Sequence, residues 1–242
     1  MQSFSTTLFA DADAEYGSAD YVLFGVPFDG TTSFKAGCRD APLAIRQVSY
    51  NIETYLPFYD LEMTDVSVHD MGDMYVECLP DLMVEQVADA VSDLIKDEKV
   101  PIMMGGEHSV TIGAVQTLKP KWYVVCDAHL DMQDEYRGSP FNHDCVTARV
   151  SEAVENIVII GARSGCKEEF ECARENYHLY TADDVEERGI RAVLELFQQN
   201  VEPFVGENAR NVEDDLRFLD AVGRLDFFRA TQRLPVDIGK VE

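Results

Sequence analysis

Short apolar runs alternate along the chain with longer stretches in which apolar residues recur at helical spacing. Four runs bounded by Gly, Pro or Asp predict buried strands: "YVLFGVPF" at 21–28, "VPIMMGG" at 100–106, "WYVVCD" at 122–127 and "NIVIIGARS" at 156–164. The amphipathic stretches predict helices at 41–49, 82–96, 109–118, 144–154, 167–175 and 190–199. This alternation predicts an α/β fold with a central parallel sheet and helices on both faces.

Polar clusters follow each of the predicted strands. They read "PFDGTTS", "GGEHS", "DAHLD" and "GARSG" in chain order. In open parallel sheets, ligands bind outside the carboxyl ends of the strands. We therefore expect these clusters to gather at one edge of the sheet and to form the functional site there.

The "DAHLD" cluster carries ionisable groups at alternate positions, Asp127, His129 and Asp131. If the strand continues through them, the three side chains share one face, and they make a ligand set suited to Mn, Fe, Zn or Co. The alternative is a strand-end loop in which Asp127 caps a helix and His129 is exposed, and an isolated D-x-H-x-D pattern favours it. A further histidine, His108, follows the neighbouring strand after two glycines, so we favour a shared metal site.

Size and composition limit the classes of function. With 242 residues, of which 46% are hydrophobic, the chain can bury a substantial core as one large domain. A formal charge of −25 argues against a nucleic-acid partner and fits either cationic substrates or a solubilising surface.

The predicted location is the cytoplasm. No apolar run is long enough to span a bilayer, so no membrane association is expected, and the N-terminus lacks the pattern of a signal peptide. Six cysteines without close metal-type spacing are typical of reduced thiols.

Several segments taken together resemble the ureohydrolase family, the arginases and agmatinases, and are closest to agmatinase. They are "GVPFDGTTSFKAGCRDAPLAIRQVSYNIETY", "GGEHSVT", "DAHLDMQDEYRGSPFNHDCVTARV" and "IGARSGCKEEFECAREN". The resemblance runs from about Val22 to about Thr181. It implies a three-layer α/β fold, a metal site that usually holds two Mn²⁺, and release of urea from a guanidino compound.

The resemblance also implies roles for individual residues. His108, Asp127 and Asp131 would hold one metal, Asp127 and His129 would hold the other, and His143 would shuttle protons. Metal-bound water is a strong nucleophile at neutral pH, which the unreactive guanidinium carbon requires, and a histidine can protonate the departing amine. The expected reaction converts agmatine to putrescine and urea, and family members usually form trimers or hexamers.

Other residues have less specific interpretations. His143 could instead lie at a helix N-terminus without a catalytic role, although Asn142 or Asp144 would cap that helix better. Asp134 and Glu135 lie where agmatinase-like proteins surround the amine end of the substrate, and a solvated surface loop is the equal alternative. Glu107 is expected to be a structural acid, because neighbouring strand-end residues point apart.

The C-terminal part departs from the family pattern. The family supplies further metal ligands from a later strand reading S-x-D-x-D, and this motif is absent after Asn200, as is a match for the glutamate that pairs with the guanidinium. We therefore predict an incomplete ureohydrolase-like domain at 1–200 that lacks its C-terminal strands, and an atypical tail at 201–242. A truncation or a frameshift would explain the tail, which holds five of the 13 arginines.

The missing motif leaves a second functional hypothesis open. In it the chain is a catalytically inactive family member that binds at most one metal or a subunit partner.

Overall fold

The computed structural model describes residues 7–57, 59–193 and 195. Its strands are β1 (Tyr21–Val26), β2 (Tyr55–Leu56), β3 (Leu61–Glu62), β4 (Val68–Asp73), β5 (Val100–Gly105), β6 (Trp122–Cys126), β7 (Asn156–Ala162) and β8 (His178–Thr181). Its α-helices are α1 (Ala41–Ser49), α2 (Pro80–Lys96), α3 (Val110–Leu118), α4 (Val146–Ser151), α5 (Lys167–Asn176) and α6 (Ala182–Arg188). Single 3-10 turns are η1 (Cys38–Asp40), η2 (Met63–Asp65) and η3 (His143–Cys145).

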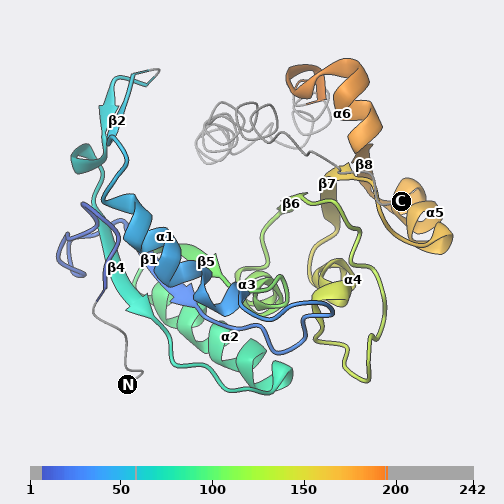
Figure 1. The fold of residues 1–242 in the computed structure, drawn as a ribbon, viewed down its shortest axis with the longest axis horizontal. Coiled ribbons are helices and arrows are strands. Elements are labelled where there is room, and N and C mark those ends of the chain that lie inside the picture. Colours follow the sequence, from blue (N-terminus) through green and yellow to red (C-terminus); the bar gives the residue numbers. More distant parts are fainter. Residues whose placement is uncertain (1–6, 58, 194, 196–242) are drawn as a thin grey trace, which may run out of the picture.

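The longer strands form two parallel sheets. One has the order β4-β1-β5 and the other the order β6-β7-β8, while β2 and β3 make a small antiparallel hairpin. Figure 1 shows the two sheets in separate regions of the fold, with α3 between them. The predicted parallel α/β class is therefore confirmed, but the described strands are not hydrogen-bonded into a single sheet.

Helices cover both faces of the first sheet, as its alternating side chains require. Val22 and Phe24 of β1 pack into the main core, to which α2 and α3 also contribute. Leu23 faces the other way, and its register partner Asp70 on β4 bonds Arg46 of α1. Because successive strand residues point to opposite faces, α1 and α2 lie on opposite sides of this sheet.

One core joins the two sheets. It contains Val22 and Phe24 from β1 together with Ile157 and Ile159 from β7, all with exposed fractions of 1% or less. Helix α3 contacts both α2 and α4 and so carries the packing from one sheet to the other (Figure 1).

The four predicted strands and most of the predicted helices are present with small shifts at their ends. The predicted helix at 144–154 is shorter and begins as the turn η3, because α4 starts only at Val146. Residues 190–193 are helical as predicted, and the rest of the predicted helix at 190–199 falls largely outside the described residues. The predicted tail at 201–242 and the absence of C-terminal strands also concern residues outside the described part, so they remain predictions.

Among the residues that the structure describes, no helix combines the length and the apolar character that crossing a bilayer requires.

Candidate metal centre

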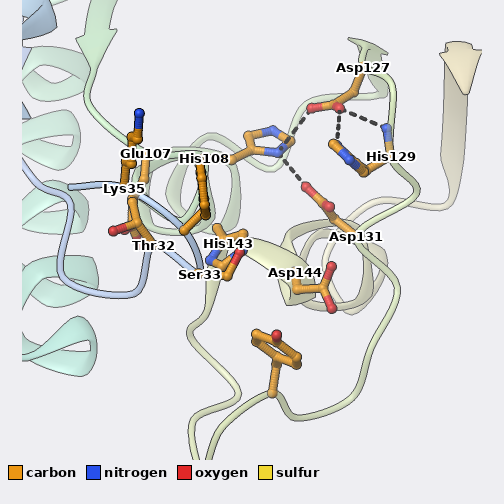
Figure 2. Close-up of a pocket in the computed structure, with 12 residues that line it drawn as sticks. Thr32, Ser33, Lys35, Glu107, His108, Asp127, His129, Asp131, His143 and Asp144 are labelled. Atoms are coloured by element: carbon orange, nitrogen blue, oxygen red, sulfur yellow. Dashed lines mark hydrogen bonds and ion pairs between the residues drawn. The ribbon is translucent and has the colours of Figure 1, made fainter. Parts of the chain in front are cut away.

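Three side chains with metal-ligand chemistry converge where β5 and β6 end. His108 Nδ1 lies 2.6 Å from Asp131 Oδ2 and 3.4 Å from Asp127 Oδ2. One ligand atom from each residue falls within 4.8 Å of the other two. Figure 2 shows the three side chains pointing toward one another across the end of the pocket. The predicted convergence of His108 with the "DAHLD" segment is therefore present in the structure.

The local backbone explains how this convergence arises. Strand β6 ends at Cys126, and Asp131 has a left-handed backbone with φ of 50°. The strand therefore does not continue through the cluster, and the condition under which the three side chains would share one face of a strand is not met. A turn brings the carboxylates together instead: Asp127 Oδ1 accepts the His129 backbone N–H at 2.8 Å, and the Asp131 carbonyl accepts the Thr147 N–H of α4 at 2.9 Å.

The histidine comes from a turn that only glycine allows. A Cβ atom on Gly106 would lie 2.1 Å from the carbonyl oxygen of Phe28. The Glu107 backbone N–H donates to the same carbonyl at 2.8 Å. This close approach holds the "GGEHS" turn against the loop that follows β1 and directs His108 toward the β6 side.

His129 lies at the rim of the cluster rather than inside it. Its side chain is 60% exposed, and Nδ1 lies 3.4 Å from Asp127 Oδ1. Asp127 thus has one carboxylate oxygen near each of the two histidines. Figure 2 shows His129 on the far side of Asp127 from His108. This arrangement is compatible with a second ion near His129, for which the described residues bring together two ligands, Asp127 and His129.

Burial and nearby carboxylates both perturb ionisable groups that neighbour the cluster. Burial, followed by the charges of Asp131 and Asp127, raises the pKa of Tyr123, whose hydroxyl lies 3.5 Å from His108 Nε2. Burial, followed by the charges of Asp131 and Glu169, raises the pKa of Asp144. Carboxylates crowded in this way favour a bound cation, so the donor set and its charge fit a hard or borderline divalent metal.

His143 stands apart from the three ligands and is held by the loop after β1. Its backbone N–H donates to Thr31 Oγ1 at 3.1 Å, and its ring Nδ1 lies 3.1 Å from the same oxygen. Asn142 caps the turn η3 by accepting from the Asp144 N–H, as predicted, so His143 is free of a capping role. Figure 2 shows His143 beside Ser33, at a distance from the three converging ligands.

Glu107 is a buried structural acid, as expected, and not part of the ligand cluster. Its Oε2 accepts the Thr31 backbone N–H at 2.8 Å, and its Oε1 accepts the Ser109 hydroxyl at 2.6 Å. The Thr31 hydroxyl also donates to Oε1. His108 and Glu107 therefore point to different partners, although both border the pocket.

A pocket of about 460 Å³ contains these groups, which is a size suited to a small organic molecule. Its wall includes the loop after β1, where Asp29 accepts from the Gly37 N–H at 2.7 Å and from Arg39 Nε at 2.5 Å. The lining residues are Thr32, Ser33, Phe34, Lys35, Glu107, His108, Asp127, His129, Asp131, Tyr136, His143 and Asp144.

The two predicted substrate-binding acids do not line this pocket. Asp134 is 94% exposed and pairs with Arg149 at 2.6 Å, and Glu135 is exposed. Their assignment to the substrate's amine end stays a prediction. The sequence did not identify Thr31 or Tyr136 as part of the site, and Asp144 was expected only as a possible helix cap. The "DGTTS" cluster after β1 was the signal that pointed to this side of the pocket.

Comparison with known proteins places the chain among its relatives. Residues 19–207 match the family model described as Arginase family. The chain belongs to the arginase family.

The relatives to which this arginase-family chain is similar include an agmatinase and an N(1)-aminopropylagmatine ureohydrolase. It is 47% identical over 160 residues to the N(1)-aminopropylagmatine ureohydrolase of Thermococcus kodakarensis, covering 65% of this chain and 56% of the relative. It is 42% identical over 153 residues to the agmatinase of Pyrococcus horikoshii, covering 62% of this chain and 54% of the relative. The chain thus spans a little over half the length of these curated relatives.

Solved structures with the same fold also include an agmatine ureohydrolase. The structure of that enzyme from Thermoplasma volcanium is 37% identical with a TM-score of 0.75, and the match covers 81% of this chain and 68% of that chain. Proclavaminate amidino hydrolase from Streptomyces clavuligerus shares the fold at 24% identity, with a TM-score of 0.73 and coverage of 81% and 70%. The predicted three-layer arginase-like α/β fold is confirmed by these likenesses.

Proposed function

We propose that this arginase-family protein is a metal-dependent amidinohydrolase that releases urea from a guanidino compound, with agmatine as the first substrate to test. The observation that carries the proposal is the convergence of His108, Asp127 and Asp131 at the end of a pocket that also holds His143. The similarity to an N(1)-aminopropylagmatine ureohydrolase and an agmatinase supports a guanidino substrate. The cationic guanidinium also suits the acidic pocket.

The proposed metal is Mn²⁺, with His108, Asp127 and Asp131 as its ligands and Asp127 and His129 as the start of a second site. A bound divalent ion lowers the pKa of its water and so supplies hydroxide at neutral pH. The carboxylates would bind the ion and, with the rest of the acidic wall, attract and orient the substrate cation.

His143 would donate the proton that the departing amine needs. In the proposed reaction water adds to the guanidinium carbon, the bond from that carbon to the substituted nitrogen breaks, and this nitrogen leaves as the amine of putrescine while the carbon leaves in urea. An imidazole is suited to this step because it exchanges protons near neutral pH. Asp134 and Glu135 remain candidates for contact with the amine tail of agmatine.

A second candidate function follows from the ligand count. Within the described residues, His108, Asp127 and Asp131 are the one cluster in which a metal could have three ligands. A chain that holds a single ion weakly would be a catalytically inactive family member or a partner for other subunits.

We also propose that the protein is a cytoplasmic homo-oligomer. Its six free cysteines support the cytoplasmic location. Exposed apolar side chains on α1, such as Val48, support the assembly into oligomers.

One experiment separates the two functions. The full chain is purified with Mn²⁺, the bound metal per chain is counted by elemental analysis, and urea release from agmatine is measured. Two ions per chain with urea release supports the enzyme. One ion or none, without turnover at any Mn²⁺ concentration, supports the inactive member and contradicts the proposed hydrolase.

A further inference from the structure

Thr31 joins His143 to a buried carboxylate that is not a candidate metal ligand. The threonine hydroxyl donates to Glu107 Oε1, and the His143 Nδ1 atom lies 3.1 Å from the same hydroxyl oxygen. Both Thr31 and Glu107 are buried, with exposed fractions of 8% and 6%. The three side chains come from three separate segments of the chain, so this contact is a product of the tertiary fold.

The hydrogen-bonding capacity of the threonine hydroxyl fixes the direction of each bond. A hydroxyl has one proton to donate and two lone pairs that accept. Glu107 accepts the Thr31 backbone N–H and the Ser109 hydroxyl as well, so Glu107 is the acceptor in each of these contacts. The single proton of the Thr31 hydroxyl therefore points to Glu107.

The two lone pairs of that hydroxyl then face His143. One accepts the backbone N–H of His143 at 3.1 Å, and the other is left for the ring Nδ1 at the same distance. A lone pair cannot bond to another lone pair, so Nδ1 must carry a hydrogen. The neutral imidazole consequently keeps its free lone pair on Nε2.

We infer that Glu107 and Thr31 are positioning residues that lock His143 in the Nδ1–H tautomer and leave Nε2 as its only site of proton exchange. Tyr136 supports the same orientation, because its ring meets the imidazole edge-on with centroids 5.9 Å apart. The catalytic role of this lock rests on the proposed function. In that function, Nε2 would be the atom that takes up a proton and passes it to the leaving amine. A ring free to exchange tautomers would present the wrong nitrogen for part of the time.

The lock can be tested on the full chain without any turnover. The protein is labelled with ¹⁵N-histidine, and two-bond ¹H–¹⁵N correlation spectra are recorded at about pH 9, where free imidazoles are neutral. Spectra are taken metal-free and with Zn²⁺, which is diamagnetic. The His143 signals are identified by their loss in His143→Asn. We expect a pyrrole-type shift at Nδ1 and a pyridine-type shift at Nε2. A proton on Nε2 in the unmutated protein would overturn the inference.

Substitutions at Thr31 then test the cause of the lock. Thr31→Val keeps the shape and removes the hydroxyl, so we expect His143 to shift toward averaged or Nε2–H signals, whereas Thr31→Ser restores the wild-type pattern. The matched control is Thr32→Val in the same loop, whose hydroxyl bonds the Asp29 carbonyl at 3.2 Å, and it should leave the His143 signals unchanged. An unchanged tautomer in folded Thr31→Val would contradict the role of the hydroxyl.

The proposed hydrolase supplies a separate readout. If urea is released, Thr31→Val should lower kcat by up to about 10²-fold with little change in KM, and Thr31→Ser should recover most of the loss. A higher KM with an unchanged kcat in Thr31→Val would contradict a role in proton transfer. If no urea is released, the proposed function fails while the tautomer measurement still decides the lock.

Discussion

Asp127 occupies the central place in the candidate metal centre. Its Oδ2 atom lies 3.4 Å from His108 Nδ1 and its Oδ1 atom lies 3.4 Å from His129 Nδ1, so it could serve as a ligand of both proposed ions. Asp131 contacts only His108 of these two histidines among the described bonds. Loss of the Asp127 charge should therefore affect both ions, whereas loss of Asp131 should affect mainly one.

We expect Asp127→Asn to weaken Mn²⁺ binding by at least about 100-fold, because an amide replaces an anionic ligand of the same shape. Any urea release should be abolished with it. Isothermal titration with Mn²⁺ and a urea assay measure the two effects. Asp93→Asn, which breaks only an exposed ion pair on α2, is the control and should match the wild-type protein. Wild-type Mn²⁺ affinity in Asp127→Asn would remove Asp127 from the site.

The site residues that could be predicted from the sequence are those with metal-ligand side chains directly after a predicted strand. His108, Asp127 and Asp131 meet both conditions, and both conditions can be recognised in the sequence alone. Thr31 is different, because its bond to His143 spans 112 residues and its sequence context reads as an ordinary turn. The use of a hydroxyl that joins two distant side chains is set by packing, which a local pattern does not contain.

At the scale of elements, a buried charge network joins α1 to β4. Arg46 has no exposed surface, and its guanidinium donates to Asp70 at 2.7 Å and 2.8 Å and also to Asp73. Asp70 further accepts the Phe9 backbone N–H at 2.6 Å. The network therefore fastens the N-terminal segment, α1 and the edge strand β4 to one another.

We expect Arg46→Met to destabilise the protein by about 3–5 kcal/mol, because it removes the guanidinium that pairs with the buried Asp70 carboxylate. Urea denaturation measures the change. The control is Arg188→Met, which removes an exposed i,i+4 pair with Asp184 and should cost less than about 1 kcal/mol. Equal losses in the two variants would show that the buried network is no stronger than a surface pair.

The loop after β1 gives a pH-dependent prediction. A hydrogen bond from Arg39 holds the pKa of the buried Asp29 carboxyl below its ordinary value. The unfolded chain thus takes up this proton at a higher pH than the folded chain does, so the stabilisation is complete above the ordinary value of about 3.9 and is lost as pH falls through the lowered pKa. At neutral pH, Asp29→Asn should therefore be less stable than the wild type.

Measuring the stability of the wild type and of Asp29→Asn across pH tests whether the stabilisation by Asp29 is lost as the pH falls. The stability gap between wild type and Asp29→Asn, followed by urea denaturation, should be constant near neutral pH and should shrink below about pH 4. The surface variant Asp93→Asn should show no such narrowing. A gap that widens as the pH falls would mean that the carboxylate is not stabilised by Arg39.

Element prediction failed where tertiary pairing overrides the local pattern. Strand β4, "VHDMGD", was missed because its buried Asp70 reads as a polar surface residue unless Arg46 is known to neutralise it. Strand β8 is short and only half-buried throughout. Helix α6 did carry a signal, since Thr181 and Asp184 form a capping box at its start. Strands β1, β5, β6 and β7 were found because they are continuous apolar runs, although only β1 and β7 are largely buried as predicted and β5 and β6 are mostly half-buried.

At the scale of the whole molecule, the candidate metal centre joins the two parallel sheets. His108 follows β5 of one sheet, whereas Asp127 and Asp131 follow β6 of the other. Among the described strands, β5 pairs with β1 and β6 pairs with β7, so no backbone hydrogen bond of the strand ladders links the two sheets. An ion held by both strand ends would add a direct link to the shared core.

We therefore expect Mn²⁺ to stabilise both sheets together. At a free concentration 100 times the dissociation constant, binding should add about 2.7 kcal/mol to the free energy of unfolding. Hydrogen exchange, measured by mass spectrometry, should slow in 100–105 and in 122–126 alike when Mn²⁺ is added. Asp127→Asn should show neither the added stability nor the slower exchange. Slower exchange confined to one of the two segments would mean that the ion is bound within one sheet and does not link β5 to β6.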